Sequence, residues 1–209
     1  MVPKIIHRFW SGPEMPEEYR RFGESWARHH PEWEMKLWKD DNLPSLVHQK
    51  LYDQAETPCY KSELVRYEVV FQQGGIYVDT DFECLRSIEP LIEGLEAFSA
   101  QQYDDIQKPG AIACGFFGAV PGHPWIKDIL DRIPHAWDPQ LDTIGPPFFT
   151  SITLRHPEVK ILDKKFFYPY NSWEKHRRAG PFPEAFAVHH WEGSWVKHHN
   201  VVLAARKAR

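Results

Sequence analysis

Two aspartates separated by a single residue, Asp79 and Asp81, are the first candidates for chemistry in this sequence. They follow the short apolar run Ile76-Tyr77-Val78, which is rich in β-forming residues and comes directly after Gly74-Gly75. Two carboxylates at the exit of a buried strand repel each other unless a cation or a donor group compensates their charge. Alternation along a strand predicts that both side chains point to the same side, where they can share one ion. Oxygen ligands of this kind favour Mn²⁺ or Mg²⁺.

The segment before the glycine pair adds a carboxylate and a guanidinium, Glu63 and Arg66. Residues three apart on a helix project from the same face, so the two side chains can act together. The carboxylate can hold hydroxyl groups of a ligand, and the guanidinium can bind phosphate or steady Asp79. An ordinary intrahelical ion pair is the alternative interpretation.

A third candidate, His189, lies near the end of the sequence. The run Ala187-Val188-His189-His190-Trp191 predicts a last strand. From this strand His189 can supply a neutral imidazole as a further ligand to a metal whose coordination two carboxylates leave incomplete. The loop Gly193-Ser194-Trp195 follows, and a simple turn with a core tryptophan is the alternative interpretation of that loop. The pairs His29-His30 and His198-His199 have no partner motif, and we interpret them as surface or packing residues.

The elements that must position these residues alternate between strand and helix. Thr57 as N-cap, Pro58 as first helical residue and Gly74-Gly75 as the stop predict a helix over Pro58 to Gln73. The other patterns predict helices at 17–29, at 125–133 and from Pro146 on, strands at 4–9, 33–39, 76–78, 97–100 and 159–162, and an apolar segment at 111–120. This mixture predicts a three-layer α/β domain with ligands at the carboxyl ends of the strands.

The whole-chain properties narrow the class of protein. A length of 209 residues fits a single domain over residues 1–209, and a net charge of −4 gives no general attraction to nucleic acid, which we do not expect as a partner. Three widely spaced cysteines and the lack of an apolar leader favour a cytoplasmic protein. The basic turn Arg206 to Arg209 allows peripheral contact with the inner face of a membrane, although a solvated helix end is the simpler interpretation.

The run Lys61-Ser62-Glu63-Leu64-Val65-Arg66-Tyr67, followed by Gly74-Gly75-Ile76-Tyr77-Val78-Asp79-Thr80-Asp81, resembles glycosyltransferase family 32. The family pattern is Ser-Asp-Leu-x-Arg-Tyr and then Gly-Gly-x-Tyr-x-Asp-x-Asp. The resemblance continues at 3–7 with Trp10, at 145–146, and at 189–195, and therefore covers nearly the whole chain. Glu63 stands where the family usually has Asp, and the extra methylene makes a donor preference inferred from relatives unsafe.

The resemblance implies a GT-A-like fold, a single α/β domain with a mixed, mostly parallel sheet flanked by helices. It implies a nucleotide-diphosphate sugar as donor, with a hexose on UDP favoured, and a divalent cation, Mn²⁺ or Mg²⁺, on the diphosphate. It also implies retention of the anomeric configuration and a glycan or lipid-linked glycan as acceptor, as in surface polysaccharide synthesis. Asp81 is then a direct metal ligand, and Asp79 is shared between the metal and donor hydroxyls.

The resemblance also assigns the donor contacts. Trp10 and Tyr77 match positions that face the nucleotide in similar enzymes, and Trp10 is the stronger candidate for stacking on the base. Ser194 and Trp195 would close over the diphosphate. The predicted sets are Asp79, Asp81 and Arg66 for catalysis, Asp79, Asp81 and His189 for the metal, and Trp10, Glu63, Arg66, Tyr77, Asp79, Ser194 and Trp195 for the donor.

Two other functions share this donor site. A nucleotide-sugar hydrolase would bind the diphosphate with the same residues and use water as the acceptor. A non-catalytic carbohydrate-binding module on the same scaffold would be expected to have lost the carboxylates or Arg66, and both are present. No carboxylate is positioned by a motif for double displacement, so a same-face route assisted by the leaving phosphate is the expected course of a retaining transfer.

Overall fold

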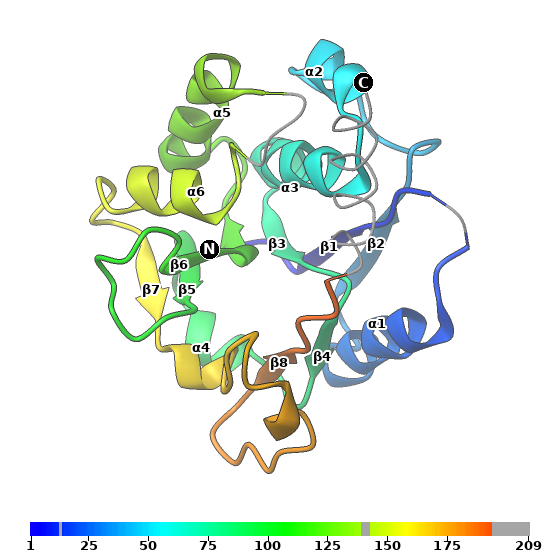
Figure 1. Ribbon diagram of the computed structural model, residues 1–209, viewed down its shortest axis with the longest axis vertical. Coiled ribbons are helices and arrows are strands. Elements are labelled where there is room, and N and C mark those ends of the chain that lie inside the picture. The colour runs from blue at the N-terminus through cyan, green and yellow to red at the C-terminus, as the bar shows by residue number, and fades with distance from the viewer. Residues whose placement is uncertain (13, 139–142, 194–209) are drawn as a thin grey trace, which may run out of the picture.

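The computed structural model describes residues 1–209 except residue 13, residues 139–142 and residues 194–209. A six-stranded sheet with the order β2-β1-β3-β6-β5-β7 forms its centre (Figure 1). The strands are β1 (Ile5–Phe9), β2 (Glu34–Trp38), β3 (Gly75–Val78), β5 (Ala97–Gln101), β6 (Ile112–Ala119) and β7 (Lys160–Leu162). Strand β6 pairs antiparallel with β3 and β5, and the other pairs are parallel. The carboxyl ends of β1, β3 and β5 therefore lie at one edge of the sheet.

Helices and a small second sheet cover the two faces of this sheet. The helices are α1 (Glu17–His29), α2 (Gln49–Gln54), α3 (Pro58–Gln73), α4 (Glu89–Ile92), α5 (Pro124–Ala136) and α6 (Pro146–Thr153), with short 3₁₀ turns at Lys164–Phe166 and Lys175–Arg177. The second sheet pairs β4 (Phe82–Cys84) with β8 (Ala187–His189). Helices α3, α5 and α6 lie on one side, and α1 with β4 and β8 lies on the other (Figure 1).

The two faces carry separate apolar cores. Leu64 of α3 and Trp125 of α5 belong to one core, and Trp26 of α1 and Phe82 of β4 belong to the other. Each of these side chains is fully buried, which removes its apolar surface from water. The predicted three-layer α/β architecture is confirmed. None of the helices described here combines the length and the apolar character needed to cross a membrane. The single-domain assignment stays a prediction.

Helix α3 and the glycine pair that ends it deliver β3 to the centre of the sheet. Thr57 Oγ1 accepts a hydrogen bond from the Tyr60 N–H at 3.3 Å, which caps the helix as predicted. Gly74 has a φ of +66°, and a Cβ there would lie 2.6 Å from Pro121 Cδ. A Cβ on Gly75 would lie 2.6 Å from the carbonyl oxygen of Ile5. Only glycine therefore fits where the chain turns from α3 into β3 beside β1.

Strand β6 contains an irregularity next to the candidate site. Its register with β5 shifts between Ser99 and Gln101. In a regular strand, residues three positions apart face opposite sides of the sheet. Cys114 and Phe117 nevertheless both pack on the core beneath α3, so the alternation of faces is interrupted around Gly115. The Asp79 N–H donates to the Gly115 carbonyl at 2.8 Å, which places this irregularity directly beside the Asp-x-Asp segment.

Candidate active site

The Asp-x-Asp segment is a turn between two strands. Strand β3 ends at Val78, and the Phe82 N–H that opens β4 donates to the Asp79 carbonyl at 3.2 Å. The prediction that strand alternation brings Asp79 and Asp81 together was therefore wrong, because the turn does so instead. The buried guanidinium of Arg8 donates to the Thr80 carbonyl at 2.8 Å and fixes the middle of this turn.

Asp79, Asp81 and His189 form a group that can hold a metal ion. One ligand atom from each side chain lies within 4.8 Å of the other two. His189 reaches the group because β8 pairs with β4 in a register that sets His189 opposite Phe82. Its Nε2 lies 3.0 Å from Asp81 Oδ1. Two carboxylates and an imidazole are a donor set that can hold a divalent cation, and the carboxylate oxygens suit the Mn²⁺ or Mg²⁺ that the sequence predicts.

Hydrogen bonds hold the Asp81 carboxylate in its ionised form. Burial on its own raises the pKa of a carboxyl group, but the imidazole of His189 and the Glu192 N–H, which donates to Asp81 Oδ2 at 3.0 Å, outweigh this effect. The pKa of Asp81 consequently lies below its ordinary value. The carboxylate is thus charged at neutral pH and available to a cation.

Arg66 of α3 positions the other carboxylate. Its side chain is 6% exposed, and its Nη2 lies 3.4 Å from Asp79 Oδ1. The guanidinium also donates from Nη1 to Cys114 Sγ at 3.0 Å and from Nε to the Ser62 carbonyl at 3.1 Å. Burial opposes the charge, but the Asp79 carboxylate more than compensates and raises the pKa of Arg66 well above its ordinary value. Of the two roles that the sequence left open, the contacts show Arg66 steadying Asp79.

Tyr77 does not offer an open face to a ligand. Its ring is 1% exposed and stacks on Phe117, with ring centroids 6.0 Å apart. The guanidinium of Arg66 lies 5.0 Å from the centroid of the same ring. The burial corrects the prediction that Tyr77 stacks on a nucleotide base. Tyr77 instead makes a cation–π contact with Arg66, in an environment that largely excludes water.

Gly115 makes room for Asp79, and sequence reasoning missed it. A Cβ at this position would lie 2.3 Å from Asp79 Oδ2 and 3.1 Å from Asp79 Cγ. The signal available in the sequence was a glycine inside the apolar segment at 111–120, because glycine in a strand often marks a bulge or a close approach. Gly115 thus determines where the carboxylate can sit.

A cavity of about 730 Å³ contains these groups. Predicted site residues that line it are Trp10, Glu63, Arg66, Tyr77, Asp79, Asp81 and His189. Its wall also includes residues outside the predicted sets, among them Ser62, Gln102, Cys114, Gly115, Tyr168, Lys175 and Glu192. The predicted contacts Ser194 and Trp195 lie outside the described residues. The structure therefore gathers the described members of all three predicted sets around one space.

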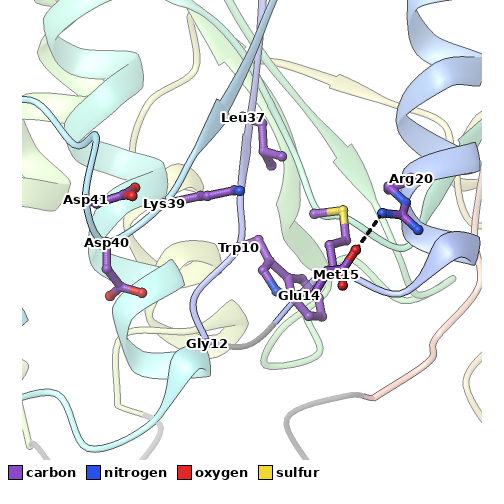
Figure 2. A pocket seen from close by; sticks show the side chains of 9 residues that line it. All are labelled: Trp10, Gly12, Glu14, Met15, Arg20, Leu37, Lys39, Asp40 and Asp41. Atoms are coloured by element: carbon purple, nitrogen blue, oxygen red, sulfur yellow. Dashed lines mark hydrogen bonds and ion pairs between the residues drawn. The ribbon is translucent and has the colours of Figure 1, made fainter.

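Figure 2 shows the residues that line a second cavity, of about 520 Å³. Trp10 belongs to the walls of both cavities, and its ring contacts Tyr19 with centroids 5.2 Å apart. Asp40, in the wall of the second cavity, accepts hydrogen bonds from Tyr52 at 2.6 Å and Lys61 at 2.7 Å. Figure 2 shows Trp10 with Glu14 and Met15 on one side of this space and Asp40 and Asp41 on the other. The indole of Trp10 therefore stands where the two spaces meet.

Comparison with known proteins identifies the segment that carries the turn. Residues 16–98 match the family model described as "Glycosyltransferase sugar-binding region containing DXD motif". This part of the chain is similar to glycosyltransferase sugar-binding regions. The matched range includes α3 with Glu63 and Arg66, the glycine pair, and both aspartates of the Asp-x-Asp turn. The resemblance to Asp-x-Asp glycosyltransferases is thereby confirmed.

Curated relatives are similar to larger parts of the chain than the family model is. Inositol phosphoceramide mannosyltransferase 3 of Schizosaccharomyces pombe is 28% identical over 139 residues, which are 64% of this chain and 37% of that protein. Mannosyl phosphorylinositol ceramide synthase CSH1 of Saccharomyces cerevisiae is 26% identical over 194 residues, 82% of this chain and 50% of that protein. The chain thus spans a third to a half of the length of these relatives.

The fold matches solved glycosyltransferases. The PaToxG glycosyltransferase superposes with a TM-score of 0.57 at 17% identity, over 75% of this chain and 70% of that chain. The predicted GT-A-like fold is confirmed.

Proposed function

We propose that this chain is a metal-dependent glycosyltransferase that moves a hexose from a nucleotide-diphosphate sugar to a glycan or lipid-linked glycan. The observation that carries the proposal is the group of Asp79, Asp81 and His189, with ligand atoms within 4.8 Å of one another on the wall of a 730 Å³ cavity. The matched sugar-binding region supports the reaction class, because it contains both aspartates.

Different residues of the cavity can be assigned to different parts of the donor. Asp79, Asp81 and His189 would hold Mn²⁺ or Mg²⁺ at the diphosphate, and the ion would stabilise negative charge on the leaving nucleotide. The chain's own task is to keep the carboxylates in place, which Arg66 does for Asp79 and the Glu192 N–H does for Asp81. We assign the nucleotide base to the boundary that Trp10 forms between the two cavities, where a flat ring can stack on it.

The donor sugar and the stereochemistry are finer parts of the proposal. The names of both curated relatives describe mannosyl transfer, which supports a hexose as the transferred sugar. We favour UDP-sugars as donors, and the turnover assay below is run with UDP-sugars and, separately, with GDP-mannose. Asp79 and Asp81 contact Arg66 and His189, so neither is placed as a free nucleophile, and we propose retention by a same-face route in which the leaving phosphate accepts the proton.

Asp81→Asn tests the proposed site directly. We expect Mn²⁺-dependent turnover of the donor to fall by about 10²-fold or more, because a ligand of the charge-stabilising group is lost. Thermal unfolding in the presence of Mn²⁺ and UDP should show a stabilisation in the wild-type protein that the variant lacks. Asp131→Asn, at an exposed ion pair with Lys127 on α5, is the matched control and should behave as wild type.

The outcomes separate the competing functions. Equal turnover in Asp81→Asn and wild type would refute the site. Metal-dependent release of free sugar that acceptors do not divert would instead identify a hydrolase. Metal-dependent donor binding without any turnover would identify a binding module.

A further inference from the structure

An exposed tryptophan stands beside the main cavity, outside the predicted donor contacts. Trp173 is 63% exposed, and its ring stacks on Tyr103 with centroids 5.9 Å apart and planes 16° apart. Lys108 Nζ lies 4.2 Å from the centroid of Tyr103 and 5.5 Å from that of Trp173. We call these three residues the aromatic platform. A large ring left in water forgoes the stabilisation that burial would give, and exposed apolar surface of this kind often marks a binding site.

Hydrogen bonds hold both loops of the platform in place. Glu174 Oε2 accepts from the Asn171 N–H at 2.8 Å and from Asn171 Nδ2 at 2.7 Å, and the Glu174 N–H donates to the Asn171 carbonyl at 2.8 Å. Trp173 thus sits inside a closed four-residue turn. On the other loop, Gln101 Nε2 donates to the Tyr103 carbonyl at 2.5 Å. The rings are therefore pre-organised, which lowers the entropy cost of binding a ligand.

The platform joins the cavity through its immediate neighbours. Gln102 and Ser172, which adjoin Tyr103 and Trp173 in the chain, line the same cavity as Asp79 and Asp81. Lys175 also lines this cavity and lies two residues beyond Trp173. A ligand that rests on the platform can therefore extend into the space that holds the candidate metal group.

The sheet order places the platform and Trp10 on opposite sides of the Asp-x-Asp turn. Trp10 follows β1, Asp79 follows β3, and Tyr103 comes two residues after β5, at the same edge of the sheet. In the order β1-β3-β6-β5, strands lie about 4.8 Å apart, so the end of β5 is roughly 10 Å from that of β3. A donor whose base lies at Trp10 and whose diphosphate lies at the aspartates leaves the β5 side for its reaction partner.

We propose that the aromatic platform is the acceptor subsite and that it binds a cyclic polyol, a pyranose or an inositol ring, against the faces of Trp173 and Tyr103. This inference rests on the proposed transferase function. The apolar C–H face of such a ring packs on an aromatic face, and its hydroxyls stay free to point into the cavity. The acceptor oxygen then bonds to the anomeric carbon, the bond from that carbon to the diphosphate oxygen breaks, and the acceptor proton passes to the leaving phosphate.

Two lysine side chains on or near the platform distinguish a neutral ring from a phosphorylated one. Lys108 on the platform and Lys175 on the cavity wall place positive charge beside the subsite. A ring that carries a phosphate gains from this charge, whereas a neutral sugar relies on stacking alone. The probes are therefore methyl α-D-mannopyranoside for a neutral pyranose and myo-inositol 1-phosphate for a phosphorylated ring.

The test compares Trp173→Ala, Trp173→Phe and the wild-type protein in transfer assays with each probe. We expect Trp173→Ala to raise the acceptor KM by about tenfold, because one stacking face is lost, while the donor KM changes less than twofold. Trp173→Phe keeps a flat face and should restore most of the acceptor affinity. Leu154→Ala, which removes a 45% exposed side chain after α6, is the control and should leave both KM values unchanged.

The outcomes distinguish this inference from the proposed function. An unchanged acceptor KM in Trp173→Ala, or an equal rise in the donor KM, overturns the subsite. If the wild-type protein turns over no donor, the proposed function fails, and saturation-transfer NMR with the two probes still decides the platform. Ring-proton signals that disappear in Trp173→Ala support a polyol site, and the absence of signals from both probes overturns it.

Discussion

Gly115→Ala is the substitution that most directly tests how the site is built. The added Cβ would lie 2.3 Å from Asp79 Oδ2, whereas ordinary contacts begin at 3.4 Å, so the carboxylate must move by about 1 Å. That movement would also strain the 3.4 Å ion pair between Asp79 and Arg66. The backbone of Gly115 does not have the positive φ of the left-handed region, so alanine adds no strain of its own. The effect should therefore fall on the site.

The size of the effect follows from the displacement. A misplacement of about 1 Å in a catalytic group costs about 10²-fold in rate, which corresponds to about 2.7 kcal/mol of transition-state stabilisation. Steady-state kinetics with Mn²⁺ and a nucleotide-sugar donor measure this loss as kcat/KM. Calorimetric titration of the protein with Mn²⁺ and the nucleoside diphosphate should show weaker binding in parallel.

Gly118→Ala supplies a matched control in the same strand. Its Cβ would lie 2.7 Å from Phe98 Cε1 and 2.9 Å from the Gly75 carbonyl, away from the carboxylates. Overpacking of this kind costs about 1–3 kcal/mol of stability, so this variant should unfold at a lower temperature while its folded fraction keeps wild-type kinetics. If Gly115→Ala binds Mn²⁺ and turns over donor as the wild type does, the assignment of Asp79 to the site is refuted.

Three further predictions address the supporting structure. Arg66→Lys keeps the charge but loses the forked contacts to Cys114 and Ser62, so kcat/KM should fall at least about tenfold, and unchanged kinetics would show that charge alone suffices. Burial lowers the pKa of His7 from 6.5 to about 4, so the unfolded chain binds more protons between these values. The free energy of unfolding should then rise with pH across that window by up to about 3 kcal/mol, a slope that urea titrations should find reduced in His7→Gln. Gly74→Ala introduces contacts of 2.6 and 2.8 Å at a positive φ, and its free energy of unfolding should fall by about 2 kcal/mol or more, whereas an unchanged unfolding midpoint would contradict the packing described.

Much of the fold was predictable because its signals are local. The bounds of α1 and α3 agree with the prediction, since charge and apolar spacing, the Thr57 cap and the glycine stop all act within a few residues. The antiparallel direction of β6 was not predictable, because it depends on which strands become neighbours. Strand β8 was predicted as the last strand, but its partner β4 was missed, because β4 has three residues and the two strands pair over a long sequence distance.

The candidate site was predictable in its residues but not in its geometry. Asp79 and Asp81 stood out by type and spacing, yet a turn and the contacts of Arg8 and Arg66 arrange them. The burial of Tyr77 depends on which face of β3 meets α3, and a short run of apolar residues does not reveal this. Trp173 carries no local pattern, and its stacking on Tyr103 arises only when the loops after β5 and β7 meet.

We expect the pairing of β8 with β4 to make assembly of the site a late event in folding. Asp81 and His189 are 108 positions apart, and among the described residues the six-stranded sheet uses none beyond Leu162. Contacts that close such long loops form slowly compared with local ones. A chain that stops before Ala187 should fold its central sheet but leave the edge of β4 unpaired and lack the third metal-binding side chain. The candidate metal group is thus complete only after β8, the last strand in the described part of the chain, has docked on β4.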